Sequence, residues 1–163
     1  MKDKITIYTD GAAKGNPGKA GWGVVVLLGQ NSGIPKGVYE IGGSMAHATN
    51  NQMELTAPIE ALKYLKKSPH RQDLWGSVEI VSDSKYVILG ITEWIFNWQK
   101  NNWRNAANKP VLNKELWQEL YQLTEELNPK WTYVKGHNED KYNDRADLIA
   151  TSFAEGEPVE LKR

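Results

Sequence analysis

Two kinds of hydrophobic pattern alternate along this chain. Ile5 and Ile7 lie two positions apart with a more polar residue between them, which is the period of a strand with two unlike faces. Such alternation, or a run of β-branched residues, predicts five strands, at 5–10, 21–28, 37–43, 78–83 and 130–135. Short turns separate the first three strands, so we expect them to form an antiparallel meander.

Helical spacing first appears after the third strand. Thr49 or Asn50 is expected to begin this helix in a capping box that Gln52 completes. Pro58 lacks an amide hydrogen and crowds the carbonyl of Glu54, so we expect a kink or an early loosening of the helix there. The apolar face carries Leu55, Ile59 and Leu62, and residues 68–70 are expected to end the helix.

The second half of the chain is mostly helical. Residues 84–114 are predicted to be helical in pieces, and Asn113 is expected to cap a helix that ends before Pro129. A last helix precedes a charged tail at 156–163, which we expect to be frayed. The order of elements predicts a single α/β domain over 1–163, with a mixed five-stranded sheet flanked by helices. The helix that Asn113 caps has its apolar positions at Leu116, Leu120, Leu123 and Leu127, and the last helix has them at Ala146, Ile149, Ala150 and Phe153.

Composition narrows the possible chemistry. The 163 residues include no cysteine, which excludes disulfides and thiolate metal sites. The three histidines do not cluster in the sequence, so a zinc site is disfavoured, whereas carboxylates leave magnesium and manganese open. Positive and negative side chains balance at 20 each, so attraction to phosphate needs a local basic patch. No apolar leader or membrane-spanning run is present, which predicts a cytoplasmic protein with no membrane partner.

Four carboxylates occupy positions that suit a shared site. Asp10 and Asp83 each end a strand, and if these strands are parallel neighbours, their ends lie about 4.8 Å apart. Glu54 is expected in the first turn of its helix. The alternative interpretation is an exposed charge that lies near the favourable end of the helix dipole and has no catalytic role. Asp147 is placed near the start of the last helix, but spacing alone does not separate it from the nearby acids Asp140 and Asp144.

Uncompensated carboxylates that meet in one place repel each other and hold protons. Two magnesium ions about 3.5–4 Å apart remove this conflict, and they can activate a water on one side and stabilise a leaving oxygen on the other. The expected chemistry is hydrolysis of a phosphodiester, with water as the nucleophile. His137, in a polar loop, is a candidate proton relay, although a surface histidine in a turn has the same signature.

Several separated motifs resemble those of one family, the bacterial type 1 ribonucleases H, in the family's order and spacing. The motifs are YTDG (8–11), GNPG (15–18), TNNQMEL (49–55), SDSKYV (82–87), KGH (135–137) and NDRAD (143–147). The resemblance implies a ribonuclease H-like fold. It also implies that the metal-binding acids are Asp10, Glu54, Asp83 and Asp147, and that His137 assists turnover.

The same resemblance implies an activity and a substrate. The family cuts the RNA strand of RNA–DNA hybrids, leaves 3′-hydroxyl and 5′-phosphate ends, and has little sequence preference. We therefore expect an endonuclease that uses Mg²⁺, with Mn²⁺ as a substitute. We also expect a monomer without an obligate protein partner, because the sheet and helices can close one core on their own.

The family's substrate contacts map onto several residues of this chain. Asn16, Asn50 and Asn51 match positions that touch the hybrid near the cut, and Thr49 and Asn113 match a pocket for a DNA phosphate. The stretch 94–114, including Trp94 and Trp103, resembles the family's basic protrusion, which contacts the DNA strand; packed helix surface is the alternative. It has fewer positive charges than in the best-known bacterial members, so we expect weaker and less salt-sensitive binding. Lys85 stands where relatives often carry an uncharged residue, and it is a further candidate contact.

Two other functions fit parts of the pattern. A non-catalytic hybrid-binding module would keep the substrate contacts, but an intact set of four acids argues against it. A sugar kinase would share the early Asp-Gly turn, but it needs a second, nucleotide-binding domain, for which this length leaves no room.

Overall fold

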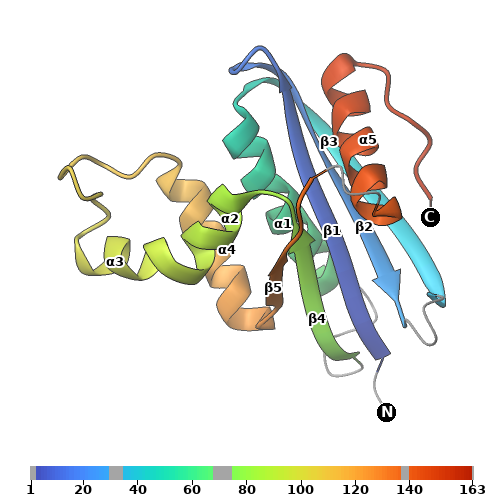
Figure 1. Cartoon of the computed structure of the whole chain (residues 1–163), viewed down its shortest axis with the longest axis horizontal. Helices are drawn as coiled ribbons and strands as arrows, with labels where there is room; N and C mark the ends of the chain where they lie inside the picture. Colours follow the sequence, from blue (N-terminus) through green and yellow to red (C-terminus); the bar gives the residue numbers. More distant parts are fainter. Residues whose placement is uncertain (1–2, 30–34, 68–74, 137–139, 163) are drawn as a thin grey trace.

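The computed structural model describes residues 3–29, 35–67, 75–136 and 140–162. Its centre is a five-stranded mixed sheet with strand order β3-β2-β1-β4-β5 (Figure 1). The first three strands pair antiparallel, and β4 and β5 add in parallel beside β1. The predicted mixed sheet and its meander are therefore confirmed. The strands are β1 (Asp3–Lys14), β2 (Gly18–Leu28), β3 (Gly37–Ala48), β4 (Trp75–Ser82) and β5 (Lys130–Tyr133).

Helices cover both faces of the sheet. The long helices are α1 (Asn50–Lys67), α4 (Lys114–Leu127) and α5 (Lys141–Glu155). A separate helical arm leaves the sheet after β4 and comprises α2 (Lys85–Leu89), the π-helical turn η2 (Gly90–Trp94) and α3 (Ile95–Lys100). Figure 1 shows α5 on one side of the sheet and α1 on the other, with the arm projecting away from it. No helix in these described ranges is both long and apolar enough to span a bilayer.

The strand β2 shows why both faces need cover. Val24 and Val26 pack into the core beneath α1 and α4, whereas Val25 and Leu27 pack against α5. Successive side chains of a strand point to opposite faces, so a continuous apolar run has one half of its residues in each core. Trp117 of α4 is fully buried in the larger core.

The α1 helix begins as predicted and continues past its proline. The Gln52 N–H donates to Thr49 Oγ1 (3.1 Å), and the Thr49 N–H donates to Gln52 Oε1 (2.9 Å), which is a complete capping box. The helix runs unbroken through Pro58 to Lys67, so the expected loosening is wrong. Pro58 is itself buried, and packing of this helix against the sheet maintains it. The predicted end at 68–70 lies outside the described residues.

Two predictions for the second half need correction. Helix stops at Lys100, and residues 101–113 form turns with an isolated bridge between Arg104 and Pro110. Several residues there have positive φ, which a helix does not accept. Asn113 precedes α4 as predicted, but its side chain makes no cap hydrogen bond.

The C-terminal tail is docked, contrary to the predicted fraying. The Glu40 N–H donates to the Lys162 carbonyl, and the Lys162 N–H donates to Glu40 Oε1, both at 2.9 Å. Val159 and Leu161 pack against the core under α5. Residues 156–162 therefore cover the outer strand β3. The charged composition of the tail does not indicate this pairing, because the partner residue Glu40 is distant in the sequence.

Candidate active site

Asp10 lies inside a strand, not at its end as the sequence predicted. The parallel pairing of β1 with β4 stops at Thr9 and Ser82, whereas β1 continues to Lys14 paired with β2. Beyond Thr9, one edge of β1 is therefore no longer covered by β4. Asp10 is the first residue of this uncovered stretch, and its side chain is 4% exposed. The predicted turn comes later, after Lys14, and contains a cis Asn16–Pro17 bond.

Gly11 brings Glu54 beside Asp10. A Cβ at Gly11 would lie 2.5 Å from the backbone nitrogen of Glu54, so only glycine lets β1 and α1 approach this closely. The Gly11 N–H donates to Asp10 Oδ1 (2.9 Å) and lies 3.2 Å from Glu54 Oε1, which also accepts from it. Because the capping box starts the helix at Asn50, Glu54 is in the second turn, and the predicted first-turn position is wrong.

Asp83 completes a cluster of three carboxylates. It follows the last residue of β4, as predicted for a strand end. One carboxylate oxygen each from Asp10, Glu54 and Asp83 lies within 4.8 Å of the other two. The chain returns to this point after β5, where a Cβ at Gly136 would be 3.0 Å from Asp83 Oδ2. His137 itself lies outside the described residues.

Asp147 approaches the cluster from the opposite face of the sheet. A Cβ at Gly23 would lie 2.5 Å from the Ala146 carbonyl, so this glycine allows α5 to pack closely on β2. Asp147 is the seventh residue of α5. It is not one of the three acids whose oxygens lie within 4.8 Å of one another, but it is close enough to Asp10 to contribute to the raised Asp10 pKa. The competing acids are placed differently: Asp140 caps α5 by accepting from the N–H groups of Tyr142 and Asn143, and Asp144 is exposed.

The cluster holds protons when no cation balances it. Burial raises the pKa of Asp10, and the neighbouring Glu54 and Asp83 raise it further. Burial likewise raises the pKa of Glu54, which the hydrogen bond with Asp10 partly offsets. Glu54 Oε2 is buried and has no hydrogen-bond partner among the described residues. A buried, unpaired carboxylate oxygen facing other carboxylates fits a hard cation that prefers oxygen ligands.

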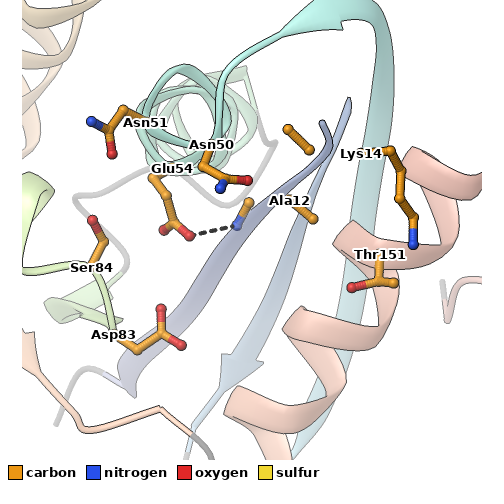
Figure 2. Close-up of a pocket in the computed structure, with 10 residues that line it drawn as sticks. Ala12, Lys14, Asn50, Asn51, Glu54, Asp83, Ser84 and Thr151 are labelled. Atoms are coloured by element: carbon orange, nitrogen blue, oxygen red, sulfur yellow. Dashed lines mark hydrogen bonds between the residues drawn. The ribbon is translucent and has the colours of Figure 1, made fainter. Parts of the chain in front are cut away.

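Two of the acids, Glu54 and Asp83, line a pocket that is formed by β1, α1, α5 and the segment between β4 and α2. Figure 2 shows Glu54 and Asp83 facing the same hollow, with Asn50 and Asn51 on the α1 side. The far end of the pocket is lined by Lys14 and Thr151. The pocket therefore combines an acidic end with a polar and basic one.

Hydrogen bonds join several of the predicted substrate-binding residues near the start of α1, where Asn50 and Asn51 line the pocket. Asn16 Oδ1 accepts from the Asn50 N–H at 2.9 Å, which ties the β1–β2 turn to the helix. Thr49 and Asn113 are joined through Gln52, whose Nε2 lies 3.3 Å from Asn113 Oδ1 and donates to it. The structure thus brings together Thr49 and Asn113, which are 64 positions apart in the sequence.

Of the remaining predicted contacts, Lys85 and Trp94 lie on the helical arm and Trp103 lies in the turns that follow it. Trp94 is 38% exposed and packs between Tyr86 and Trp98, with ring centroids 6.2 and 6.1 Å away. Trp103 packs against Trp98 at 6.3 Å. Lys85 Nζ lies over the ring of Tyr133, 5.6 Å from its centroid. These aromatic side chains serve the core and also present ring surface to solvent.

Some groups of the site cannot be identified from the sequence motifs. The Gly11 N–H is a backbone donor, which no side-chain motif reveals. The Tyr86 hydroxyl accepts from Asn113 Nδ2 (3.2 Å) and from Trp117 Nε1 (3.1 Å), and it joins the arm to α4. Gln52 was found as a capping residue, and its reach to Asn113 appears only when α1 and α4 are packed together.

Comparison with known proteins identifies the family. The sequence model of the RNase H family matches residues 2–155. Ribonuclease H of Thermosynechococcus vestitus is 48% identical over 157 residues, which cover 96% of this chain and 92% of that protein.

Solved structures agree. LC9-RNase H1, described as a type 1 RNase H with the type 2 active-site motif, superposes with a TM-score of 0.77 at 25% identity, over 96% of this chain and 74% of that one. LC11-RNase H1, solved in complex with an RNA/DNA hybrid, has a TM-score of 0.62 at 28% identity, over 93% and 97% of the two chains. With this fold and this family match, the chain belongs to the ribonuclease H family.

Proposed function

We propose that this protein is an endonuclease that hydrolyses the RNA strand of RNA–DNA hybrids. The observation that carries the proposal is the convergence of Asp10, Glu54 and Asp83 within 4.8 Å, in a chain of the ribonuclease H family. A homologous structure, LC11-RNase H1, was solved with an RNA/DNA hybrid, which supports the substrate. The products would be 3′-hydroxyl and 5′-phosphate ends.

The four acids Asp10, Glu54, Asp83 and Asp147 are proposed to hold Mg²⁺, with Mn²⁺ as a substitute. When bound, a pair of such ions activates the attacking water and stabilises the leaving oxygen. The protein's own part is positioning: the Gly11 N–H orients two of the carboxylates, and burial of Asp10 excludes water from one side of the cluster. His137 remains the predicted proton relay.

The substrate contacts are part of the same proposal. Asn16, Asn50 and Asn51 are proposed to hydrogen bond to 2′-hydroxyl groups and so distinguish RNA from DNA; the proximity of Asn50 and Asn51 to Glu54 and the Asn16–Asn50 hydrogen bond support this. Thr49 and Asn113 form the proposed phosphate pocket. Lys85, Trp94 and Trp103 are proposed to contact the DNA strand. Recognition through sugar and phosphate explains the expected lack of sequence preference. The monomeric state and the cytoplasmic location stay predictions.

The test is cleavage of an end-labelled RNA–DNA hybrid, compared with duplex DNA, duplex RNA and single-stranded RNA of the same sequence. We expect Mg²⁺-dependent cleavage of the hybrid alone, inhibition by EDTA, and loss of activity in Asp10→Asn. The matched control is Asp144→Asn, which changes an exposed acid of the same helix as Asp147 and should retain activity. Full activity in Asp10→Asn would overturn the metal assignment, and binding without cleavage would favour the non-catalytic module.

A further inference from the structure

The pocket next to the acids has a second end that the proposed catalytic assignment does not use. Its lining includes Lys14 from the last position of β1 and Thr151 from α5. Figure 2 shows both side chains beyond Ala12, on the side of the hollow away from Asp83. Because they line the same hollow as Glu54 and Asp83, a nucleic-acid strand lying on these two acids would continue toward Lys14 and Thr151.

Two rows of side chains connect the acids to this end. Asp10, Ala12 and Lys14 lie two residues apart on β1, so they share one face of the strand. Asp147, Thr151 and Glu155 lie four residues apart on α5, so they share one face of the helix. The rows begin at Asp10 and Asp147 and end at the ion pair between Lys14 and Glu155.

The lengths of the two rows agree. Four residues of β-strand span about 13 Å, and eight residues of α-helix span about 12 Å. The ammonium group of Lys14 is therefore a few nucleotides away from the acids along an extended strand. Ala12 is the only side chain between Asp10 and Lys14 on that face of β1, and its small size leaves the path open.

The partner of Lys14 is easily exchanged. Lys14 Nζ lies 2.9 Å from Glu155 Oε1, and the two side chains are 51% and 48% exposed. An ion pair this exposed contributes little to stability, so an incoming anion can replace the carboxylate at small cost. A phosphate oxygen makes an equivalent charge-assisted hydrogen bond with the ammonium group, and the Thr151 hydroxyl can donate a second one.

We propose that Lys14 and Thr151 form a subsite for a phosphate group of the RNA strand that flanks the cleaved bond. The Glu155 carboxylate pairs with the Lys14 ammonium group when no nucleic acid is bound, and it competes with that phosphate for the ammonium group. The inference rests on the proposed function, because it assigns the subsite to the strand that passes over the acids.

The test measures KM and kcat for hybrid cleavage with Mg²⁺ in three variants. In Lys14→Gln we expect KM to rise about tenfold at about 0.1 M salt, and the salt dependence of log(kcat/KM) to lose about one unit of slope, because one phosphate contact is lost. In Glu155→Gln we expect KM to fall about two- to fivefold, because the competing carboxylate is gone. The control, Lys67→Gln, changes an exposed lysine at the far end of α1 and should leave KM and the slope unchanged.

A second measurement locates the phosphate. Hybrids carrying a single neutral methylphosphonate linkage at successive positions of the RNA strand should lose kcat/KM at one flanking position with the wild-type protein. Lys14→Gln should be insensitive to that same substitution. If both Lys14→Gln and Glu155→Gln change KM in the same direction, or if Lys14→Gln matches Lys67→Gln, the ion pair is merely structural and the inference is wrong. A wild-type protein that cleaves no hybrid would overturn the proposed function itself.

Discussion

Asp10 and Glu54, 44 positions apart in the sequence, accept hydrogen bonds from the same backbone N–H, that of Gly11. This shared donor holds two carboxylates together in a site where burial already disfavours their charge. The arrangement costs stability when no cation is bound, because each charged carboxylate is desolvated and repelled by its neighbours. That cost is measurable.

We expect Asp10→Asn to stabilise the metal-free protein at pH 8. The pKa values of Asp10 and Glu54 are raised in the folded state, so the unfolded chain releases protons at lower pH than the folded one. Stability of the wild type therefore falls as pH rises above about 4, the ordinary carboxyl pKa. At pH 8 the wild type must take up a proton at this cluster when it folds, whereas the asparagine amide needs none, so the variant should recover about 1–3 kcal/mol, or several degrees in Tm.

The measurement is thermal unfolding in EDTA at pH 5 and pH 8. The difference between Asp10→Asn and wild type should be larger at pH 8. Asp144→Asn, at an exposed position, should show no such pH dependence. An Asp10→Asn protein that is less stable than wild type at both pH values would contradict the repulsion described above.

Metal binding should reverse the effect. Millimolar Mg²⁺ should raise the Tm of the wild type, because a ligand that binds only the folded state stabilises it. The rise should be larger at pH 8 than at pH 6, since cation binding must displace protons from acids with raised pKa values. Calorimetric titration should show proton release on binding. An equal rise in Asp10→Asn would place the ion elsewhere.

Gly11→Ala should damage both stability and the site. The new methyl group would lie 2.5 Å from the Glu54 nitrogen and the Met53 carbonyl carbon, so α1 must move away from β1. We expect a loss of about 2–3 kcal/mol, measured by urea unfolding, together with weaker Mg²⁺ binding. Gly37→Ala is the matched control, because its methyl group would make only ordinary contacts, the nearest at 3.4 Å. Equal stability of the two variants would show that α1 is not held by this approach.

Glu40→Gln should loosen the C-terminal tail. Glu40 is 2% exposed, and it accepts from Arg145 through both oxygens, at 2.8 and 3.0 Å, as well as from the Lys162 N–H. Arg145 is 28% exposed, so breaking this partly buried pair should cost about 3 kcal/mol at pH 7, the lower end of the range for buried pairs. The Arg145 and Lys162 bonds hold the pKa of Glu40 below its usual value despite its burial. Its contribution is therefore complete above about pH 4.3 and lost as pH falls toward the folded-state pKa.

Urea unfolding at pH 7 and pH 3 checks this prediction, and the gap between wild type and Glu40→Gln should narrow at pH 3. Glu155→Gln removes an exposed ion pair with Lys14 and should cost less than about 1 kcal/mol. Greater protease sensitivity of residues 156–162 in Glu40→Gln would show that the tail is released. A stability loss no larger than that of Glu155→Gln would argue against the buried pair.

The sequence by itself determined the strand order along the chain, the apolar faces of α1 and α4, the capping box at Thr49 and the acids that form the cluster. These features depend on residues that are close in sequence, where periodicity and hydrogen bonding act directly. The sequence also determined the resemblance to the ribonuclease H family, because the family's motifs are short runs of consecutive residues.

Only the tertiary structure decided the rest. Asp10 lies inside β1 because β1 stays paired with β2 as far as Lys14, and one edge of β1 is uncovered at Asp10 because its pairing with β4 stops one residue earlier. The tail is ordered because Glu40, more than a hundred residues away, hydrogen bonds to it. The placement of Lys14 beside Glu155 and the reach of Glu54 to Gly11 also join distant segments. Such contacts depend on which surfaces pack together and on where a partner strand ends, and local sequence preferences do not encode either.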